Sequence, residues 1–362
     1  MSKTIRVLHT EWSDGWGGQE IRIINEIKAI RSRGVDVFLA CKDSSSIKEN
    51  AIKNNIKVFT LPFKGNGDIK TLFLLKKIIQ KYSIDIVNTH SGKDTWVGGL
   101  AAKFAGVKFI RTRHLSNSIN TSRFNFINEL ADFIFTTGEK VRDNMIQFNR
   151  IKEDRILSIP TGIDCSIFDP EKYKREEIRK QFMFSDDEIV IGVLAVLRKF
   201  KRHDLLLSAA KVLIEKYPNK NLVFAIAGEG PQKESIKNII NNLNLKSHVK
   251  MIGHTKNAPE FLCAIDILVL SSDSKEGVPQ SVIQGLLMNQ KVVATDSGST
   301  ADLFFDNNFQ LVKKDNVRSI IDGISYYLDN SINISSRDYM ISYFSLPVMV
   351  NKIMDIYNKI LN

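Results

Sequence analysis

Residues 4–41 of the chain read TIRVLHTEWSDGWGGQEIRIINEIKAIRSRGVDVFLAC. Two short runs rich in Val, Ile and Leu enclose a glycine loop and a longer run whose apolar residues recur at helical spacing. Short apolar runs of this kind are typical of strands, and Gly34 follows the longer run where a helix commonly ends. The stretch therefore predicts a strand, a helix and a second strand, which is the repeating unit of parallel α/β sheets.

The same alternation continues along the rest of the 362 residues. The first half predicts strands at 4–10, 35–41, 84–90, 107–114, 133–138 and 156–162, with helices at 19–34, 69–83 and 95–106. The pattern then restarts and predicts strands at 188–197, 221–228, 249–253, 266–272 and 291–296, with helices at 203–218, 233–245, 258–265 and from about 280. A last amphipathic helix is expected at 346–361. Apolar strands that are spaced by helices predict parallel sheets covered on both faces.

This pattern predicts the α/β fold class, with two doubly wound domains and a ligand cleft between them. The regular alternation is interrupted near GIDCSIFDPEKYKREE, residues 162–177. The expected domains are therefore 1–168 and 169–340, and residues 341–362 are expected to form a helix that packs back on the first domain.

The composition is that of an ordinary globular protein, with 43% hydrophobic and 25% charged residues. No apolar run reaches the roughly 20 residues that cross a bilayer, and the N-terminus lacks the pattern of a signal peptide. The three cysteines are far apart and odd in number, which argues against a disulfide framework or a cysteine zinc site. Together these features predict a cytoplasmic protein.

The formal net charge is +11, and most of this excess lies in residues 1–168. A basic half favours an anionic partner: membrane lipid, a phosphate-bearing substrate or nucleic acid. A solvated basic surface explains the same charge, so composition leaves both interpretations open.

Candidate ligand-binding residues follow the predicted strands, where open parallel sheets bind their ligands. Gly15, Gly17 and Gly18 lie between the first strand and the first helix, which suits either an anion or a plain tight turn. His90 and His114 each end a strand. A structural role is the commoner one for a lone histidine, but two at such positions favour function.

The second half repeats this arrangement of residues. Arg198 and Lys201 follow its first strand, and two cations in one loop suit a diphosphate, although a solvated loop is the alternative. Gly228 and Gly230 follow the next strand and are a weak signal for a nucleotide loop.

The segment SKEGVPQSVIQG, residues 274–285, combines an acid with a helix start. Pro279 suits the first turn of a helix, and the amides of residues 280–283 would form an anion site there. Glu276 would lie at the edge of that site and accept hydrogen bonds from hydroxyls, or it would merely face the positive end of the helix dipole.

Taken together, these residues resemble the family 4 glycosyltransferases, which have the GT-B fold of two facing Rossmann-like domains. The ordered motifs are HTEW, GGQE, DIVNTH, RTRH, IPTGIDCSIFDP, VLRKFKRHD, IAGEGP, VKMIGHT, SSDSKEGVP and TDSGS, which span nearly the whole chain. Each motif is weak alone, but the ordered set is specific.

The resemblance implies that the second domain binds a UDP- or GDP-sugar and that the first binds a glycan or lipid-linked acceptor. Arg198 and Lys201 match the basic pair on the diphosphate, Glu276 matches the acid on the sugar hydroxyls, and His114 matches a histidine near that sugar. The catalytic residues implied are therefore Glu276, His114, Arg198 and Lys201. The donor-binding residues implied are Gly17, Gly18, Gly228, Gly230, Gly277, Val278, Pro279, Gln280, Ser281, Val282 and Gln284, and the acceptor-binding residues are His90 and Gln19.

The reaction implied is a hexosyl transfer that retains anomeric configuration, in the synthesis of lipopolysaccharide, O-antigen or capsule. No cofactor and no metal are expected, because the acids are scattered and the His and Cys spacing does not suit zinc. Two departures from the family pattern are Gln284, where Glu is usual, and Asp302 after Gly298-Ser299. A neutral amide still offers ribose a carbonyl acceptor, but a weaker one.

The resemblance also suggests peripheral contact with anionic lipid at the inner face of the plasma membrane. The helix at 69–82 could rest on lipid through Leu72, Leu75, Ile79 and Tyr82, but the same stripe suits a protein core better. No nucleic-acid partner is expected. The alternatives are a nucleotide-sugar 2-epimerase of the same fold and a catalytically degenerate relative.

Overall fold

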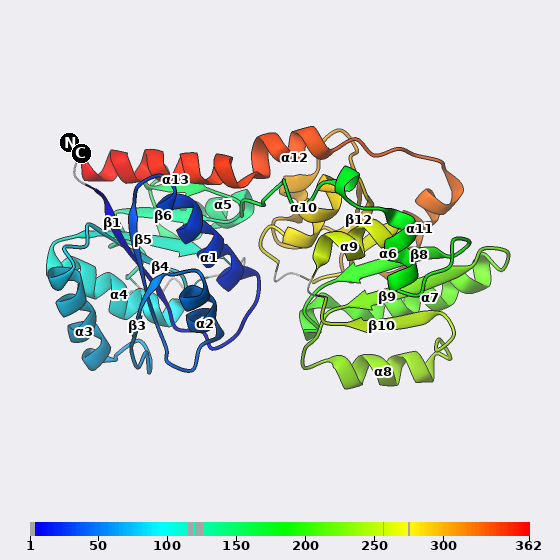
Figure 1. Cartoon of the computed structure of the whole chain (residues 1–362), viewed down its shortest axis with the longest axis horizontal. Coiled ribbons are helices and arrows are strands. Elements are labelled where there is room, and N and C mark those ends of the chain that lie inside the picture. The colour runs from blue at the N-terminus through cyan, green and yellow to red at the C-terminus, as the bar shows by residue number, and fades with distance from the viewer. Residues whose placement is uncertain (1–3, 115–118, 120–125, 256, 274–275) are drawn as a thin grey trace. The chain divides into compact units, whose positions relative to one another are not determined.

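The computed structural model describes residues 4–114, 119, 126–255, 257–273 and 276–362 (Figure 1). The chain forms two compact units, an N-terminal unit of Met1–Gly162 with Leu346–Asn362, and a C-terminal unit of Ile163–Ser345. These boundaries differ by a few residues from the predicted 168/169 and 340/341. The amide of Ile163 donates to the carbonyl of Phe344 at 2.8 Å, and both side chains lie in the core of the C-terminal unit.

The N-terminal unit is built on a seven-stranded parallel sheet of order β3-β2-β1-β4-β5-β6-β7. Its strands are β1 Arg6–Glu11, β2 Asp36–Cys41, β3 Lys57–Thr60, β4 Ile86–Thr89, β5 Lys108–Arg113, β6 Phe133–Thr136 and β7 Ile156–Ser158. Its helices are α1 Gly18–Arg31, α2 Ser46–Lys53, α3 Ile69–Lys81, α4 Gly92–Ala105, α5 Glu139–Asn149 and α13 Leu346–Leu361, with a short 3-10 helix η1 at Glu153–Arg155.

Helices cover both faces of this sheet. One face packs against α1, α2 and α13, and the other packs against α3, α4 and α5. The last helix lies along the N-terminal unit, where Met349, Val350, Ile353 and Tyr357 are buried in its core (Figure 1).

The C-terminal unit has a six-stranded parallel sheet of order β10-β9-β8-β11-β12-β13. Its strands are β8 Ile189–Leu194, β9 Leu222–Ala227, β10 Val249–Gly253, β11 Ile267–Leu270, β12 Lys291–Thr295 and β13 Gln310–Val312. Its helices are α6 Arg175–Gln181, α7 His203–Lys216, α8 Lys233–Asn242, α9 Ala258–Ala264, α10 Gln280–Leu287, α11 Val317–Asp329 and α12 Arg337–Phe344, with 3-10 helices η2 Pro170–Lys172, η3 Lys199–Lys201 and η4 Thr300–Leu303. One face packs against α6, α9, α10 and α12, and the other against α7, α8 and α11.

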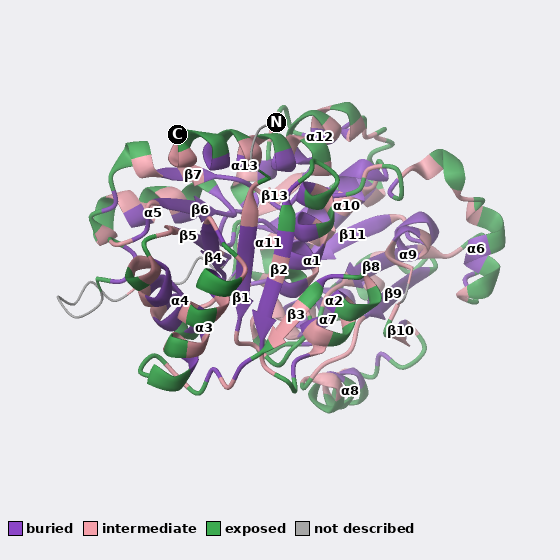
Figure 2. Ribbon diagram, turned by 60° about the vertical axis from the view of Figure 1, so that its left-hand side comes forward, coloured by how far each residue is buried: buried purple, intermediate pink, exposed green. Residues whose placement is uncertain are grey.

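The burial of the strands explains their sequence. Figure 2 shows the strands largely in the colour of buried residues, whereas the helices alternate between buried and exposed positions. A strand covered on both faces favours apolar residues on both sides, and this gives the continuous Val, Ile and Leu runs. Polar residues such as His9, Thr10 and Glu11 are buried toward the carboxyl end of β1. The predicted α/β class with two doubly wound domains is confirmed.

Helix α3 faces the core with the stripe predicted from its sequence. Leu75 and Ile79 are fully buried against α4 and the sheet, so the core interpretation of this stripe is correct. A different pair of apolar residues, Ile69 and Phe73, is exposed to 67% and 57%.

Candidate active site

An ion pair lies beyond the carboxyl ends of β8 and β11 in the C-terminal unit. Lys201 Nζ contacts Glu276 Oε1, and the hydroxyl of Ser272 donates to the same carboxylate oxygen at 2.5 Å. The exposed fractions of the two charged side chains are only 15% and 9%. The structure thus brings together two predicted catalytic residues, in a place where bulk water screens them weakly.

The loop that carries Lys201 is anchored from β11. The hydroxyl of Ser271 donates to the carbonyls of Lys201 and Arg202 at 2.9 and 3.0 Å, and the amide of Asp273 donates to Phe200 at 2.8 Å. Arg198 begins the short η3 turn and is exposed. The basic loop is therefore fixed at its Lys201 end and open to solvent at its Arg198 end.

The loop that carries Glu276 is held by a glycine. Gly298 has φ of +56°, and a Cβ added to it would lie 1.7 Å from the carbonyl oxygen of Glu276. The amide of Ser299 also donates to the carbonyl of Gly277, at 3.3 Å. Only glycine lets these two loops approach so closely. Residues 274–275 of the SSDSKEGVP motif lie outside the described part of the chain.

Gly228 and Gly230 have a local structural reason to be glycine. A Cβ on Gly228 would lie 1.9 Å from the carbonyl oxygen of Ala195, and one on Gly230 would lie 2.6 Å from that of Leu197. The Leu197 amide and carbonyl bond to residues 229 and 232. These glycines therefore support the strand end that leads into the basic loop.

Helix α10 begins at Gln280 with Pro279 as its N-cap residue. The predicted row of open amides at residues 280–283 is too long, because the amides of Val282 and Ile283 donate to the carbonyl of Pro279 at 3.2 and 3.4 Å. The side chains of Val278 and Val282 are buried in the core. Of the remaining predicted residues, Gly277, Gln280, Ser281 and Gln284 are half-buried.

In the N-terminal unit, Gln19 lies in a polar cluster around Glu11, which ends β1. Its side-chain amide contacts a carboxylate oxygen of Glu11 and donates to Ser91 Oγ at 2.7 Å. Ser91 Oγ and the Ser13 amide donate to the other carboxylate oxygen of Glu11, at 2.7 and 2.8 Å. Glu11, which sequence reasoning did not select, thereby links the glycine loop to the start of α4. Gly17 caps α1 and Gly18 is its first residue.

Two acids in this cluster have raised pKa values. Burial, reinforced by the nearby charge of Asp94, raises the pKa of Glu11 to about 7. Burial raises the pKa of Asp94 to about 6, although hydrogen bonds from Thr10 and the amides of His90 and Ser91 oppose this shift. Near neutral pH, Glu11 is therefore close to its midpoint of titration.

His90 and His114 follow β4 and β5 as predicted, and they contact each other. His90 Nδ1 lies 3.0 Å from His114 Nε2, and His90 Nε2 lies 2.8 Å from Nδ1 of His9, a β1 residue that sequence reasoning missed. All three imidazoles are buried. His9 lies within a strand, where a histidine gives no sequence signal of function. His90 and His114 follow the ends of strands, and that position is the signal by which they were selected.

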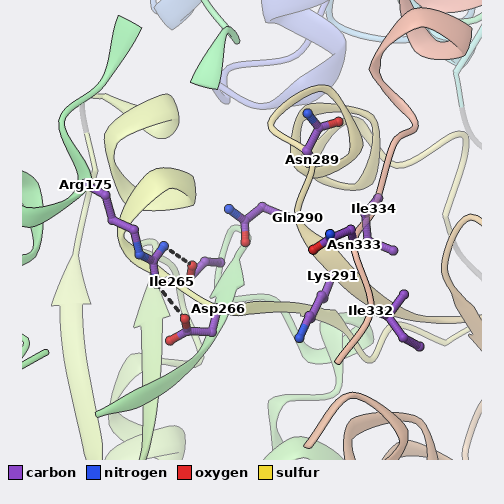
Figure 3. Close-up of a pocket in the computed structure, with 9 residues that line it drawn as sticks. All are labelled: Arg175, Ile265, Asp266, Asn289, Gln290, Lys291, Ile332, Asn333 and Ile334. Carbon is purple, nitrogen blue, oxygen red and sulfur yellow. Dashed lines mark hydrogen bonds and ion pairs between the residues drawn. The ribbon is translucent and has the colours of Figure 1, made fainter. Parts of the chain in front are cut away.

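A pocket of about 350 Å³ in the C-terminal unit lies at the opposite edge of the sheet (Figure 3). Asp266 and Lys291, which line it, stand at the amino ends of β11 and β12. The Asp266 carboxylate pairs with Arg175 at 2.6 Å and with Arg179 at 3.3 Å, and it accepts from the Val190 amide at 2.8 Å. We assign this pocket to the packing of α6, because ligands of parallel sheets bind at the carboxyl edge.

Two observations bear on metals and membranes. Among residues 4–114, 119, 126–255, 257–273 and 276–362, no group of three or more His, Cys, Asp and Glu side chains is arranged to hold a metal ion. Over the same residues, none of the helices combines the length and the apolar character that a membrane span requires.

Both halves of the chain match models of known families. Residues 16–167 match the model described as Glycosyltransferase Family 4, and residues 174–344 match the model described as glycosyl transferases group 1. The UDP-Gal:alpha-D-GlcNAc-diphosphoundecaprenol alpha-1,3-galactosyltransferase of Escherichia coli is 24% identical over 98% of this chain and 96% of its own. The putative glycosyltransferase EpsD of Bacillus subtilis is 25% identical over 77% of this chain and 76% of its own.

Solved structures share the fold. A glycosyltransferase from Rickettsia africae superposes with a TM-score of 0.89 at 22% identity, covering 99% of both chains. Anabaena HepE in complex with UDP-glucose superposes with a TM-score of 0.83 at 18% identity, covering 98% of this chain and all of the other.

Proposed function

The chain belongs to the family 4 glycosyltransferases of the GT-B fold, and on this premise we propose that it transfers a hexose from a UDP- or GDP-sugar with retention of configuration. The acceptor is a glycan or a lipid-linked glycan used for cell-surface polysaccharide such as lipopolysaccharide, O-antigen or capsule. The similarity to an enzyme named for a diphosphoundecaprenol acceptor supports this choice. The same proposal places the protein in the cytoplasm, at the inner face of the plasma membrane.

The observation that carries the proposal is the ion pair of Lys201 and Glu276 beyond the carboxyl ends of β8 and β11. When the bond between the sugar and the diphosphate breaks, negative charge develops on the leaving phosphate. Lys201 and Arg198 stabilise that charge electrostatically, and Glu276 accepts hydrogen bonds from the sugar hydroxyls. In the absence of substrate, Lys201 and Glu276 neutralise each other.

The bond changes balance without a cofactor. The acceptor hydroxyl attacks the anomeric carbon from the face that the diphosphate leaves, and its proton passes to the departing phosphate oxygen. The products are the glycoside and UDP or GDP. Because Lys201 and Arg198 supply the cationic charge, we propose that the reaction needs no metal and that activity persists in a chelator.

The test is release of UDP or GDP from common nucleotide sugars by the purified protein. We expect Lys201→Ala and Glu276→Gln to lower the rate of release by at least a hundredfold, because each removes a charge from a weakly screened site. Lys199→Ala is the matched control, since Lys199 lies exposed in the same η3 turn. Failure to release nucleotide from any of these donors would contradict the proposal.

Product analysis separates the alternatives. A donor sugar epimerised at carbon 2 without any acceptor would identify an epimerase, whereas the relatives reported above are named as transferases. A degenerate relative would release no nucleotide from any donor, and this alternative is ruled out if Gln284→Ala impairs turnover.

A further inference from the structure

Three imidazoles form a row across neighbouring strands of the N-terminal unit. His9 lies in β1, and His90 and His114 directly follow β4 and β5, which are adjacent in the sheet order. His9 Nδ1 lies 2.8 Å from His90 Nε2, and His90 Nδ1 lies 3.0 Å from His114 Nε2. The rings of His9 and His90 are stacked at 5.1 Å with an angle of 11°. None of the three is more than 9% exposed.

All three rings are neutral in the folded protein. Burial lowers the pKa of His9 to about 3 and holds the pKa of His90 and of His114 well below the usual histidine range. Positive charge on Arg22 and Arg111 adds to this effect at His90 and His114. A neutral imidazole carries one N–H donor and one bare acceptor nitrogen.

The two hydrogen bonds must therefore run in the same direction. His90 uses both of its ring nitrogens, so it accepts from one neighbour and donates to the other. Either all three rings carry the proton on Nδ1, or all three carry it on Nε2. Mixed arrangements would put two protons or two lone pairs face to face.

The far end of the row decides between these two arrangements. His9 Nε2 is buried and has no hydrogen-bond partner among the described residues. With the proton on Nδ1, this nitrogen is a bare acceptor, whereas with the proton on Nε2 it is a buried N–H without an acceptor. Orphaned buried N–H groups are rarer in proteins than unsatisfied acceptors.

We propose that His9 and His90 are positioning residues that fix His114 in its Nδ1–H tautomer. His90 then donates from Nδ1 to His114 Nε2, and His114 keeps its own proton on Nδ1. His114 is in this way an N–H donor that stabilises oxygen with growing negative charge, and it is not a general base. The catalytic consequence rests on the proposed function, in which His114 meets the donor sugar.

The direct test is NMR of the full-length protein labelled with ¹⁵N-histidine, which reports the protonation of each ring nitrogen. The chain has six histidines, and single His→Gln variants assign them. We expect a protonated Nδ1 and a bare Nε2 on His114. A protonated Nε2 on His114 of the unmodified protein would overturn the proposal, whatever the enzyme activity.

A variant tests the role of the row in catalysis. His9→Phe removes the first donor, so His114 should become a mixture of tautomers while kcat for nucleotide release falls about tenfold with little change in KM. If His9→Phe does not fold, His9→Asn replaces it. His248→Phe is the control, because His248 bonds to a backbone carbonyl in the other unit.

These outcomes separate the two proposals. An inactive enzyme whose His114 carries the proton on Nδ1 contradicts the proposed function but keeps the tautomer. An active enzyme in which His9→Phe changes neither tautomer nor kcat contradicts the positioning role.

Discussion

Gly298 is the residue at which one absent side chain decides the shape of the site. Its backbone touches the carbonyl of Glu276, and its φ of +56° is a conformation that side chains disfavour. Any larger residue must displace the backbone of Glu276 or the loop that carries residue 298. The position of the Glu276 carboxylate therefore depends on Gly298, a residue that has no side chain of its own.

We predict that Gly298→Ala lowers kcat/KM for nucleotide release by at least tenfold. The matched control is Gly106→Ala at the end of α4, where φ is +72° and an added Cβ meets nothing within 4 Å. Both variants bear the left-handed strain, about 1–2 kcal/mol, but only Gly298→Ala adds the collision. Equal activity of the two variants, measured beside their unfolding midpoints, would show that the contact has no role in catalysis.

At this scale the sequence predicts several residues that stand where strands end, but it misses Glu11 at the end of β1 and residues whose role comes from their contacts. Lys201, Glu276, His90 and His114 could be selected because motifs and strand ends mark them. Ser272, Glu11 and His9 could not, because their role depends on contacts with residues four to 81 positions away. The raised pKa of Glu11 likewise arises from burial, which a strand-end carboxylate does not reveal.

Helix α3 shows how an element can serve the core and still present an apolar surface. Leu75 and Ile79 pack inside, whereas Ile69 and Phe73 are exposed beside exposed Lys70 and Lys77. Apolar side chains flanked by lysines suit the interface of an anionic bilayer. This surface differs from the stripe that the sequence suggested for lipid.

We predict that Phe73→Ser weakens binding to vesicles containing phosphatidylglycerol by about threefold or more, because the exposed aromatic ring that would enter the interface is lost. The measurement is co-sedimentation with vesicles at low salt, and neutral phosphatidylcholine vesicles show the share due to charge. Phe148→Ser in α5 is the control, since Phe148 is 56% exposed. An equal effect of both variants would remove α3 as the contact.

Most long periodic elements were predicted, but the sequence analysis missed α11 and α5, of 13 and 11 residues, together with several short or polar elements. The expected strands and helices of the two sheets all occur, with bounds that shift by a few residues. Strands β3 and β13 have four and three residues, and neither is fully apolar, so tertiary pairing rather than sequence pattern defines them. Helices α2 and α6 were also missed, because most of their residues are polar or charged and only two residues in each are buried.

Four of the six histidines are buried, and their burial makes the stability of the whole molecule sensitive to acid. Burial lowers the pKa of His203 to about 4, as it does for His9, His90 and His114. Below about pH 6.5 the unfolded chain takes up protons at these sites while the folded chain does not, so stability is lost as the pH falls. Each such proton contributes a slope of about 1.4 kcal/mol per pH unit.

We predict that the thermal unfolding midpoint falls steeply from pH 6.5 to pH 4.5. Glu11 opposes this trend, because its raised pKa of about 7 means that the folded protein holds a proton which the unfolded chain has lost above about pH 4.5. Glu11→Gln should therefore make the acid destabilisation steeper. A midpoint that stays level over this range, or a shallower slope in the variant, would contradict the linkage.

The chain passes between the two units twice, at 162–163 and at 345–346, so the C-terminal unit is inserted into the N-terminal one. During synthesis, α1 and its sheet leave the ribosome long before α13, which completes their core with Tyr357 and Ile353. The C-terminal unit is continuous from Ile163 to Ser345, and it can reach its full set of contacts first. The N-terminal unit is thus synthesised first but completed last. Until α13 is made, the apolar face that this helix covers is exposed, and there a nascent chain would need a chaperone.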